Sequence, residues 1–313
     1  NHGNELFSVA NKNGVKLLYE SSVCAGTPII KLLNQELAAS KISKISGMLN
    51  GTSNFILSNM EEGMEFEPTL KLAQEKGYAE PDPSFDIEGT DAAHKIGILS
   101  SLAFGSSLPP KDFYIEGING IHKDDFKYAY EMGYTIKHLA IAKSMKNSID
   151  LRAHPSLVKL DSYLANLKGV RNGIEVETDL LGTLHVAGSG AGQEATASGV
   201  ISDLIYLSDA KIREVNNINE TIELIDFIDL DFQYYFYIEA SDVSGVMASI
   251  SSIFANKDVS IESISQKENL NDDLVPIIII TDPFKEKDYQ ELVDNLLDLD
   301  SVNKIRSIRI EPQ

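Results

Sequence analysis

The chain has 313 residues, of which 43% are hydrophobic and 24% are charged, and its formal net charge at pH 7 is −20. This mixture is typical of a globular protein that is long enough for two domains, each with its own core. An acidic surface of this size repels phosphate groups, which argues against binding to nucleic acid and to anionic membranes.

The start of the chain and its cysteine content bear on where the protein works. No apolar run approaches the roughly 20 residues that a membrane helix needs, and no signal peptide opens the sequence. The single cysteine, Cys24, has no partner for an internal disulfide, which predicts a cytoplasmic protein.

Residues 1–15 predict an amphipathic helix with Leu6, Val9 and Ala10 on one side. Because the chain opens on this helix without a methionine, we expect a further segment upstream.

Residues 1–208 alternate between helical and strand-like patterns. Strands are expected at 15–20, at 41–49 and in four runs within 134–188. Helices are expected at 27–40, 52–63, 67–77, 91–104 and 194–208. In the first of these, Thr27 is expected to be the N-cap and Pro28 the first helical residue. The alternation predicts one α+β domain with a mixed sheet covered by helices.

The pattern changes after Ser208. Residues 209–232 are acidic and weakly patterned, which predicts a linker. The remaining residues contain six short elements, with strands at 234–240, 259–268, 274–281 and 302–311 and helices at 245–258 and 286–299. This order is the βαββαβ arrangement of a ferredoxin-like fold. The sequence therefore predicts a second domain over residues 233–313.

The stretch "GYAEPDPSFDIEGTDAAHK" (77–95) places a lysine after several carboxylates. Asp91 and Lys95 are four residues apart in a predicted helix, so their side chains meet on one face. At about 100° per residue, they share a sector with Ile98 and Leu102, which predicts partial burial. A partly buried lysine beside carboxylates is suited to proton transfer. An ordinary exposed ion pair is the alternative interpretation.

The loop before this helix is stiffened by two X-Pro units at Pro81 and Pro83. Rigid presentation of Glu80 and Asp86 is typical of a polar binding site. The excess of carboxylates over one lysine favours a cationic ligand, such as the ammonium group of an amino acid.

The segment "GSGAGQEAT" (188–196) follows a predicted strand and opens a helix, as a nucleotide-binding turn would. Its glycine spacing differs from the dinucleotide fingerprint, and no βαβ unit surrounds it. The segment therefore predicts either a close-approach turn for a ligand or neighbouring domain, or a plain tight turn.

Two other turns also have two interpretations each. In "YESSVCAGTPII" (19–30), Glu20 and several carbonyls could bind a hard cation, although a structural turn is the simpler interpretation. In "ASDVSGV" (240–246), Asp242 and Gly245 precede a predicted helix whose N–H groups could receive a carboxylate, or the turn could simply cap that helix.

Taken together, four blocks resemble the substrate-binding catalytic domain of the homoserine dehydrogenase family. They occur in the family's order and comprise "YESSVCAGTPII" (19–30), "GMLNGTSNFIL" (47–57), "GYAEPDPSFDIEGTDAAHK" (77–95) and "GSGAGQEATASGVISDL" (188–204). Residues 233–312 resemble an ACT domain, a small amino-acid-sensing module attached to many members of the family. The family's nucleotide-binding half should precede this chain and is absent from it, so we expect the chain alone to bind cofactor poorly and to be almost inactive.

The resemblance implies NAD(P)-dependent interconversion of L-homoserine and L-aspartate 4-semialdehyde in threonine, methionine and isoleucine biosynthesis. It makes Lys95 the proton donor and acceptor, with Asp91 beside it. Glu80 and Asp91 match substrate-binding acids, and Asp86 matches a further acid near the site. The glycines that match cofactor-contacting positions are Gly77 and Gly192.

The resemblance also implies a cation site, a regulator and an oligomer. Glu20, Val23, Ala25 and Thr27 match a monovalent-cation site that holds sodium in the family. The ACT domain implies feedback inhibition, with threonine as the expected effector, and a homodimer or homotetramer. A non-catalytic amino-acid-binding regulatory module is the alternative function. Lys12, in "VANK", matches no functional position, because the similar "TANK" signature of the family lies well upstream.

Overall fold

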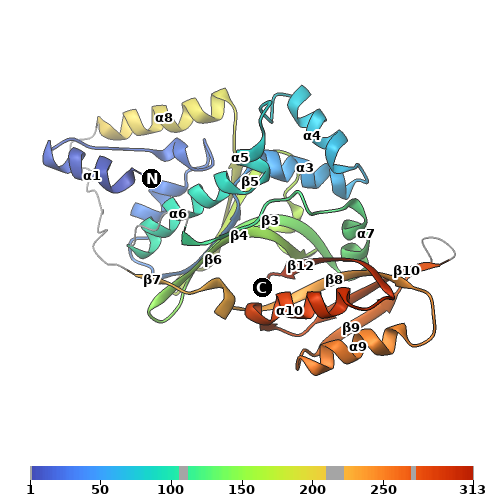
Figure 1. The fold of residues 1–313 in the computed structure, drawn as a ribbon. Helices are drawn as coiled ribbons and strands as arrows, with labels where there is room; N and C mark the ends of the chain where they lie inside the picture. Colours follow the sequence, from blue (N-terminus) through green and yellow to red (C-terminus); the bar gives the residue numbers. More distant parts are fainter. Residues whose placement is uncertain (1, 106–111, 209–221, 269–272, 313) are drawn as a thin grey trace. The chain divides into compact units, whose positions relative to one another are not determined.

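The computed structural model describes residues 2–105, 112–208, 222–268 and 273–312 (Figure 1). The described chain divides into two compact units. The first comprises residues 1–119, 138–154 and 166–225, and the second comprises residues 120–137, 155–165 and 226–313. Among the described residues, no helix is both long enough and apolar enough to cross a membrane.

The first unit contains a mixed sheet, which confirms the α+β class. Its strand order is β6-β5-β1-β3-β4. The bounds are β1 (Ile42–Met48), β3 (Tyr134–Ser144), β4 (Ser148–Lys159), β5 (Arg171–Thr178) and β6 (Gly182–Ser189). The first residues of β3, up to Lys137, and the last residues of β4, from Pro155 on, are assigned to the second unit. β1 pairs antiparallel with β3 and β5, and β5 pairs antiparallel with β6. Two short strands, β2 (Tyr114–Ile115) and β7 (Glu223–Leu224), each pair in parallel with β4.

The helices of this unit mostly fall where the pattern predicts them. They are α1 (Gly3–Lys12), η1 (Glu20–Ser22), α2 (Ile29–Lys31), η2 (Leu32–Glu36), α3 (Gly51–Glu61), α4 (Phe66–Glu75), α5 (Ser84–Ile87), α6 (Thr90–Phe104) and α8 (Gln193–Leu207). A further short helix, η4 (Leu164–Asn166), follows β4 in the chain, and its first two residues are assigned to the second unit. α6 begins and ends at glycines with positive φ, Gly89 (83°) and Gly105 (72°), a backbone conformation that glycine adopts without steric cost.

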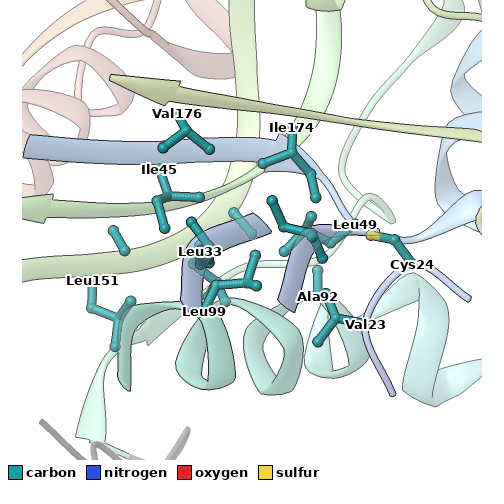
Figure 2. Packing of buried hydrophobic residues seen from close by; sticks show 14 of the residues in the cluster. Val23, Cys24, Leu33, Ile45, Leu49, Ala92, Leu99, Leu151, Ile174 and Val176 are labelled. Atoms are coloured by element: carbon teal, nitrogen blue, oxygen red, sulfur yellow. The ribbon is translucent and has the colours of Figure 1, made fainter. Parts of the chain in front are cut away.

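The core of the first unit lies between α6 and the sheet. Ala92, Ile96 and Leu99 are buried on α6, and they belong to the same cluster as Ile45 of β1 and Ile174 of β5. Figure 2 shows the labelled helix residues facing the strand residues across this layer. Because α6 carries both Asp91 and Lys95, this packing fixes where those two side chains lie.

Three local predictions in the first unit are wrong: a strand, the extent of a helix, and the start of that helix, where Pro28 is the N-cap and not the first helical residue. Residues 15–19 form no strand, and the helix expected at 27–40 begins at Ile29 and ends at Glu36, with its second part a π-helix. Thr27 does not cap it, since the Thr27 Oγ1 atom is buried and has no hydrogen-bond partner among the described residues. The Glu20 carboxylate accepts the first free N–H groups instead, a long-range cap that a local pattern does not reveal.

The second unit has the strand and helix order expected for residues 233–313. Its elements are β8 (Asp231–Ser241), α9 (Val246–Asn256), β9 (Ile261–Gln266), β10 (Leu274–Thr281), β11 (Phe284–Lys285), α10 (Glu286–Leu297) and β12 (Val302–Ile310), with η5 (Phe227–Asp229) before them and α7 (Lys123–Glu131) from earlier in the chain. The sheet order β12-β8-β10-β9 is antiparallel throughout. Of the predicted linker 209–232, residues 209–221 lie outside the described part of the chain, and the domain boundaries themselves remain a prediction.

A buried ion pair ties α7 to the sheet of the second unit. The Arg306 guanidinium on β12 contacts both carboxylate oxygens of Asp125, with its Nε 2.9 Å from Oδ2 and its Nη2 2.9 Å from Oδ1. The same guanidinium lies 3.8 Å from the centre of the Tyr237 ring. Asp125 is fully buried and also accepts the N–H of His122 at the start of α7. Each charge is therefore both paired and hydrogen-bonded, which a buried ion requires.

Candidate active site

The centre of the candidate site is the ion pair on α6. The Lys95 Nζ atom lies 2.6 Å from Asp91 Oδ2, and the two side chains are 16% and 18% exposed. The partial burial predicted from the helical pattern is therefore confirmed. Asp91 lies in the first turn of α6, where the positive end of the helix dipole stabilises a carboxylate.

A loop between β1 and α3 supplies the second contact of Lys95. The Lys95 ammonium donates to the carbonyl oxygen of Leu49 at 2.8 Å. Leu49 itself is completely buried, so this carbonyl is held in a dry environment. Among the described residues, the ammonium thus has two acceptors for its three N–H groups.

Asn50 joins the two carboxylates of the site. Its Nδ2 donates to Asp86 Oδ1 at 2.7 Å and to Asp91 Oδ2 at 2.8 Å. Its Oδ1 accepts the backbone N–H of Ser53 at 2.8 Å, so the same side chain caps α3. The first turn of α3 thereby fixes the distance between two acids that are five positions apart in the sequence.

The two linked carboxylates create an excess of negative charge around one ammonium group. Burial raises the pKa of Asp86, the nearby Asp91 raises it further, and the hydrogen bond from Asn50 partly offsets this shift. Adding a cationic group to the site would relieve the repulsion between the two acids. The arrangement is therefore suited to a ligand that carries an ammonium group.

Asn172 and Cys24 lie behind the Leu49 carbonyl. The Asn172 Nδ2 atom donates to Leu49 O at 2.9 Å and to Cys24 Sγ at 3.2 Å. Burial raises the pKa of the Cys24 thiol, and the positive charge of Lys95 partly offsets this increase. The thiol is therefore close enough to the ion pair for its charges to affect the thiol's pKa. The thiol is a packed neighbour of the site, with 1% of the residue exposed.

The structure brings three of the predicted proton-transfer and substrate-binding residues together in one cluster and leaves the fourth, Glu80, outside it. Asp86, Asp91 and Lys95 are linked directly or through Asn50. Glu80 is exposed, and its backbone carbonyl accepts from Gln74 at 3.2 Å. Within the described part of the chain, no hydrogen bond joins Glu80 to the cluster.

The two predicted cofactor glycines are exposed and open. Gly77 follows α4 and has φ of 74°, and Gly192 precedes α8 and has φ of 111°. A Cβ atom added to either glycine would meet no atom within 4 Å. Both therefore leave room for a ligand to approach the backbone, and positive φ explains why glycine is needed there.

The predicted cation residues lie around a buried carboxylate. Glu20 is 3% exposed, and its oxygens accept the N–H of Ile30 at 2.8 Å and of Lys31 at 3.0 Å. Burial raises the pKa of Glu20, while these two backbone N–H groups lower it by stabilising the charged form. The carboxylate therefore serves as a helix cap in the described structure.

The backbone beside Glu20 turns sharply between Val23 and Thr27. Cys24 and Ala25 both have positive φ, of 56° and 47°, which is uncommon for non-glycine residues. The Thr27 hydroxyl oxygen is buried without a hydrogen-bond partner among the described residues. Within the same residues, no group of three or more His, Cys, Asp or Glu side chains could hold a metal ion, so a cation here would depend largely on carbonyl and hydroxyl oxygens.

The predicted regulatory residues lie at the start of α9. Gly245 is the N-cap with φ of 97° and has no side-chain cap in the described residues. The Asp242 carboxylate accepts a hydrogen bond from Gln266 Nε2 at 3.3 Å. The backbone N–H of Asp242 donates to the Asp273 carbonyl at 3.0 Å. Gly245 therefore has no side chain that caps the first turn of α9. A helix start of this kind can receive the carboxylate of a ligand.

Sequence reasoning missed Asn50, Asn172 and the Leu49 carbonyl. Asn50 stands directly before Gly-Thr-Ser and a helical pattern, so its capping role could have been found from the helix start alone. Asn172 lies in a strand, and its partner Leu49 is 123 residues away. No local pattern marks such a contact.

Comparison with known proteins gives matches over nearly the whole chain. The family model for homoserine dehydrogenase matches residues 28–205. Homoserine dehydrogenase of Pseudomonas aeruginosa is 40% identical over 99% of this chain and 74% of its own length. That of Helicobacter pylori is 41% identical over 94% of this chain and 70% of its own length.

Solved structures agree with these sequence matches. A homoserine dehydrogenase from Thiobacillus denitrificans has a TM-score of 0.91 and 39% identity over 99% of this chain and 73% of its own chain. A hyperthermophilic archaeal homoserine dehydrogenase in complex with NADPH has a TM-score of 0.59 and 30% identity, over 69% of this chain and 62% of its own. With a matching family model over more than half of its residues and close relatives along almost its full length, the chain belongs to the homoserine dehydrogenase family of oxidoreductases.

Proposed function

We propose that this chain binds L-homoserine and L-aspartate 4-semialdehyde and exchanges the proton during their NAD(P)-dependent interconversion. The observation that carries the proposal is the Lys95 ammonium, held by Asp91 and the Leu49 carbonyl beside a second carboxylate. The reaction would serve the synthesis of threonine, methionine and isoleucine.

In the proposed mechanism, Lys95 moves the proton at the substrate's O4 atom. When homoserine is oxidised, the O4–H bond breaks and the proton passes to the neutral Lys95 amine, while C4 loses a hydride and becomes an aldehyde carbon. In the reverse direction, the Lys95 ammonium returns the proton to O4. A bound NAD(P) would accept or supply the hydride. Proton transfer of this kind requires a group within hydrogen-bond reach of O4, and such a group typically accelerates a reaction by about 10²–10⁴-fold.

The carboxylates of the site would bind the other end of the substrate. Asp91 and Asp86 are linked through Asn50, and their combined charge exceeds that of Lys95. The substrate's ammonium group would supply the missing positive charge. Glu80, which is exposed on the neighbouring loop, would add a further contact to this ammonium group when substrate binds.

The cofactor would approach this part of the enzyme at Gly77 and Gly192. Both glycines have open space where a side chain would otherwise stand, so the residues fit a ligand that lies against the backbone. The archaeal relative that was solved in complex with NADPH supports the assignment of NADP or NAD as the cofactor.

The direct test is turnover of L-homoserine in the full-length protein. We expect NAD(P)H to form in proportion to homoserine consumed, with L-serine, which lacks one methylene, a much poorer substrate. Equal rates with the two amino acids, or no reaction with either cofactor, would contradict the proposed function.

A sodium ion is proposed at Glu20, with Val23, Ala25 and Thr27. The partnerless Thr27 oxygen and the left-handed turn at Cys24 and Ala25 support an oxygen-lined position beside a carboxylate. We expect sodium chloride to raise the melting temperature more than choline chloride at equal ionic strength. The Glu20→Gln substitution, which keeps the side-chain size but removes the charge, should abolish the difference. An identical response of both proteins to both salts would contradict the sodium site.

Residues 233–313 are proposed to form an ACT domain that senses threonine. Its ligand carboxylate would meet the start of α9, near Asp242 and Gly245, where no N-cap side chain bonds the first N–H groups in the described residues. Domains of this type often associate through their sheets, so we also propose a homodimer or homotetramer. Threonine should inhibit homoserine oxidation and raise the melting temperature at millimolar concentration, with allothreonine as the control. If both isomers act equally, α9 does not form a specific site.

A further inference from the structure

Asn172 is connected to the ion pair on α6 through one shared acceptor, the Leu49 carbonyl. Its Nδ2 atom donates to the Leu49 carbonyl at 2.9 Å, and the same carbonyl oxygen accepts from Lys95 Nζ at 2.8 Å. A carbonyl oxygen has two lone pairs, so these two donors saturate it. The second Nδ2 hydrogen bond, to Cys24 Sγ at 3.2 Å, holds the amide from its other side.

The orientation of the Asn172 amide follows from its partners. A carbonyl oxygen only accepts, so Nδ2 and not Oδ1 has to face Leu49. The Oδ1 atom is consequently left buried without a hydrogen-bond partner among the described residues. Such an atom costs about 1–3 kcal/mol.

The surroundings of Asn172 are shaped to the amide. Asn172 is 1% exposed, and a Cβ atom on Gly190 would lie 2.0 Å from Asn172 Oδ1. The glycine turn after β6 therefore closes over the amide and prevents it from rotating away. This contact gives Gly190 a role that the dinucleotide fingerprint does not explain.

We propose that Asn172 is a positioning residue for Lys95 and acts through the Leu49 carbonyl. It fixes the carbonyl oxygen that, together with Asp91, determines where the Lys95 Nζ atom lies. Without this hydrogen bond, the carbonyl turns to follow Lys95, and the ammonium is no longer held at one place relative to the substrate oxygen. An error of about 1 Å in such a position can lower a rate by about 100-fold. The inference rests on the proposed proton transfer by Lys95.

The first experiment compares Asn172→Ala with Asn54→Ala in the full-length enzyme. Asn54 is a matched control, because it is 2% exposed, donates through Nδ2 to the carbonyls of Gly169 at 2.9 Å and Arg171 at 3.1 Å, and has a partnerless Oδ1 atom within the described structure. For Asn172→Ala we expect kcat to fall by about 10- to 100-fold with KM for homoserine unchanged within about twofold. For Asn54→Ala, kcat per folded enzyme should stay within about twofold. An equal loss of kcat in both variants would show a general packing effect and overturn the proposal.

A second variant and a double-mutant cycle separate positioning from folding. Asn172→Asp keeps the side-chain volume and, when ionised, has no N–H group for Leu49, so it should lose kcat as Asn172→Ala does. If the Asn172→Ala variant does not fold, the kcat of Asn172→Asp tests the positioning role in its place. In a Lys95→Ala background, adding Asn172→Ala should change the residual turnover by less than about twofold, because a positioning residue has no effect once its target is gone.

The outcomes also separate this inference from the proposed function. If Lys95→Ala is inactive but folded Asn172 variants keep normal kcat, the positioning role is wrong and the proton-transfer role stands. If Lys95→Ala itself keeps normal kcat, the proposed function of Lys95 fails, and the positioning role fails with it.

Discussion

Lys95→Ala lowers kcat for homoserine oxidation by about 10²–10⁴-fold in the full-length enzyme, the range that a general acid–base group contributes. The protein should remain folded, because the Lys95 side chain is partly exposed and its loss removes, among the described residues, the hydrogen bonds to Asp91 and Leu49. Steady-state kinetics and a thermal unfolding curve measure the two effects separately. Near-normal turnover would remove Lys95 from the mechanism.

Two further variants make this result specific. Lys95→Arg keeps the positive charge between the acids, but an arginine stays protonated at any pH of the assay and cannot accept the proton, so we expect it to be folded and nearly inactive. Lys31→Ala is the matched control. Lys31 forms a comparable lysine–aspartate pair with Asp203 at 2.8 Å, with side chains 20% and 12% exposed, and among the described residues neither side chain has a hydrogen bond to Asp86 or Asp91. Its kcat should remain close to that of the unchanged enzyme.

Arg306→Met destabilises the second unit by about 3–5 kcal/mol, because it leaves the Asp125 carboxylate buried without its counter-charge. The structure gives Asp125 no exposure, and three hydrogen bonds from Arg306 reach its two oxygens. Methionine retains much of the volume of the arginine stem, so lost charge pairing accounts for most of the effect. Urea unfolding followed by circular dichroism measures the change.

Lys285→Ala provides the control for this prediction. Lys285 also forms an ion pair within the second unit, with its Nζ atom 2.8 Å from Asp231 Oδ2. In this pair, however, the Lys285 side chain is 43% exposed and the Asp231 side chain is 54% exposed. Pairs in water contribute about 0–1 kcal/mol, since solvent screens the charges. If the two variants lose equal stability, the burial of Asp125 does not determine its energetic contribution.

The pairing of Asp91 with Lys95 follows from the sequence because both residues lie on one helix. Four positions along an α-helix bring two side chains together wherever that helix packs, and Ile98 and Leu102 on the same sector predict that the pair is partly buried. The structure has that contact and that burial. For the same reason, the element order of residues 233–313 follows from alternation and turn signals, which depend on near neighbours.

The remaining contacts of the site depend on which loops meet. Asn50 joins Asp86 to Asp91 only because the fold brings the N-cap of α3 to α5 and to the first turn of α6, and Asn172 reaches Leu49 only because β5 pairs with β1. The Glu20 carboxylate replaces the expected Thr27 cap in the same way, through a fold of the chain that brings it to the N–H groups of Ile30 and Lys31.

The sequence by itself therefore determined the family, the α+β class and the helical ion pair, each of which depends on motifs or on spacing within one element. The tertiary structure alone decided which carbonyl holds Lys95, which amides hold the carbonyl and the acids, and which carboxylate caps the helix at Ile29. These contacts join residues up to 123 positions apart, and hydrogen-bond geometry at that separation is set by the packing of whole elements and not by local periodicity.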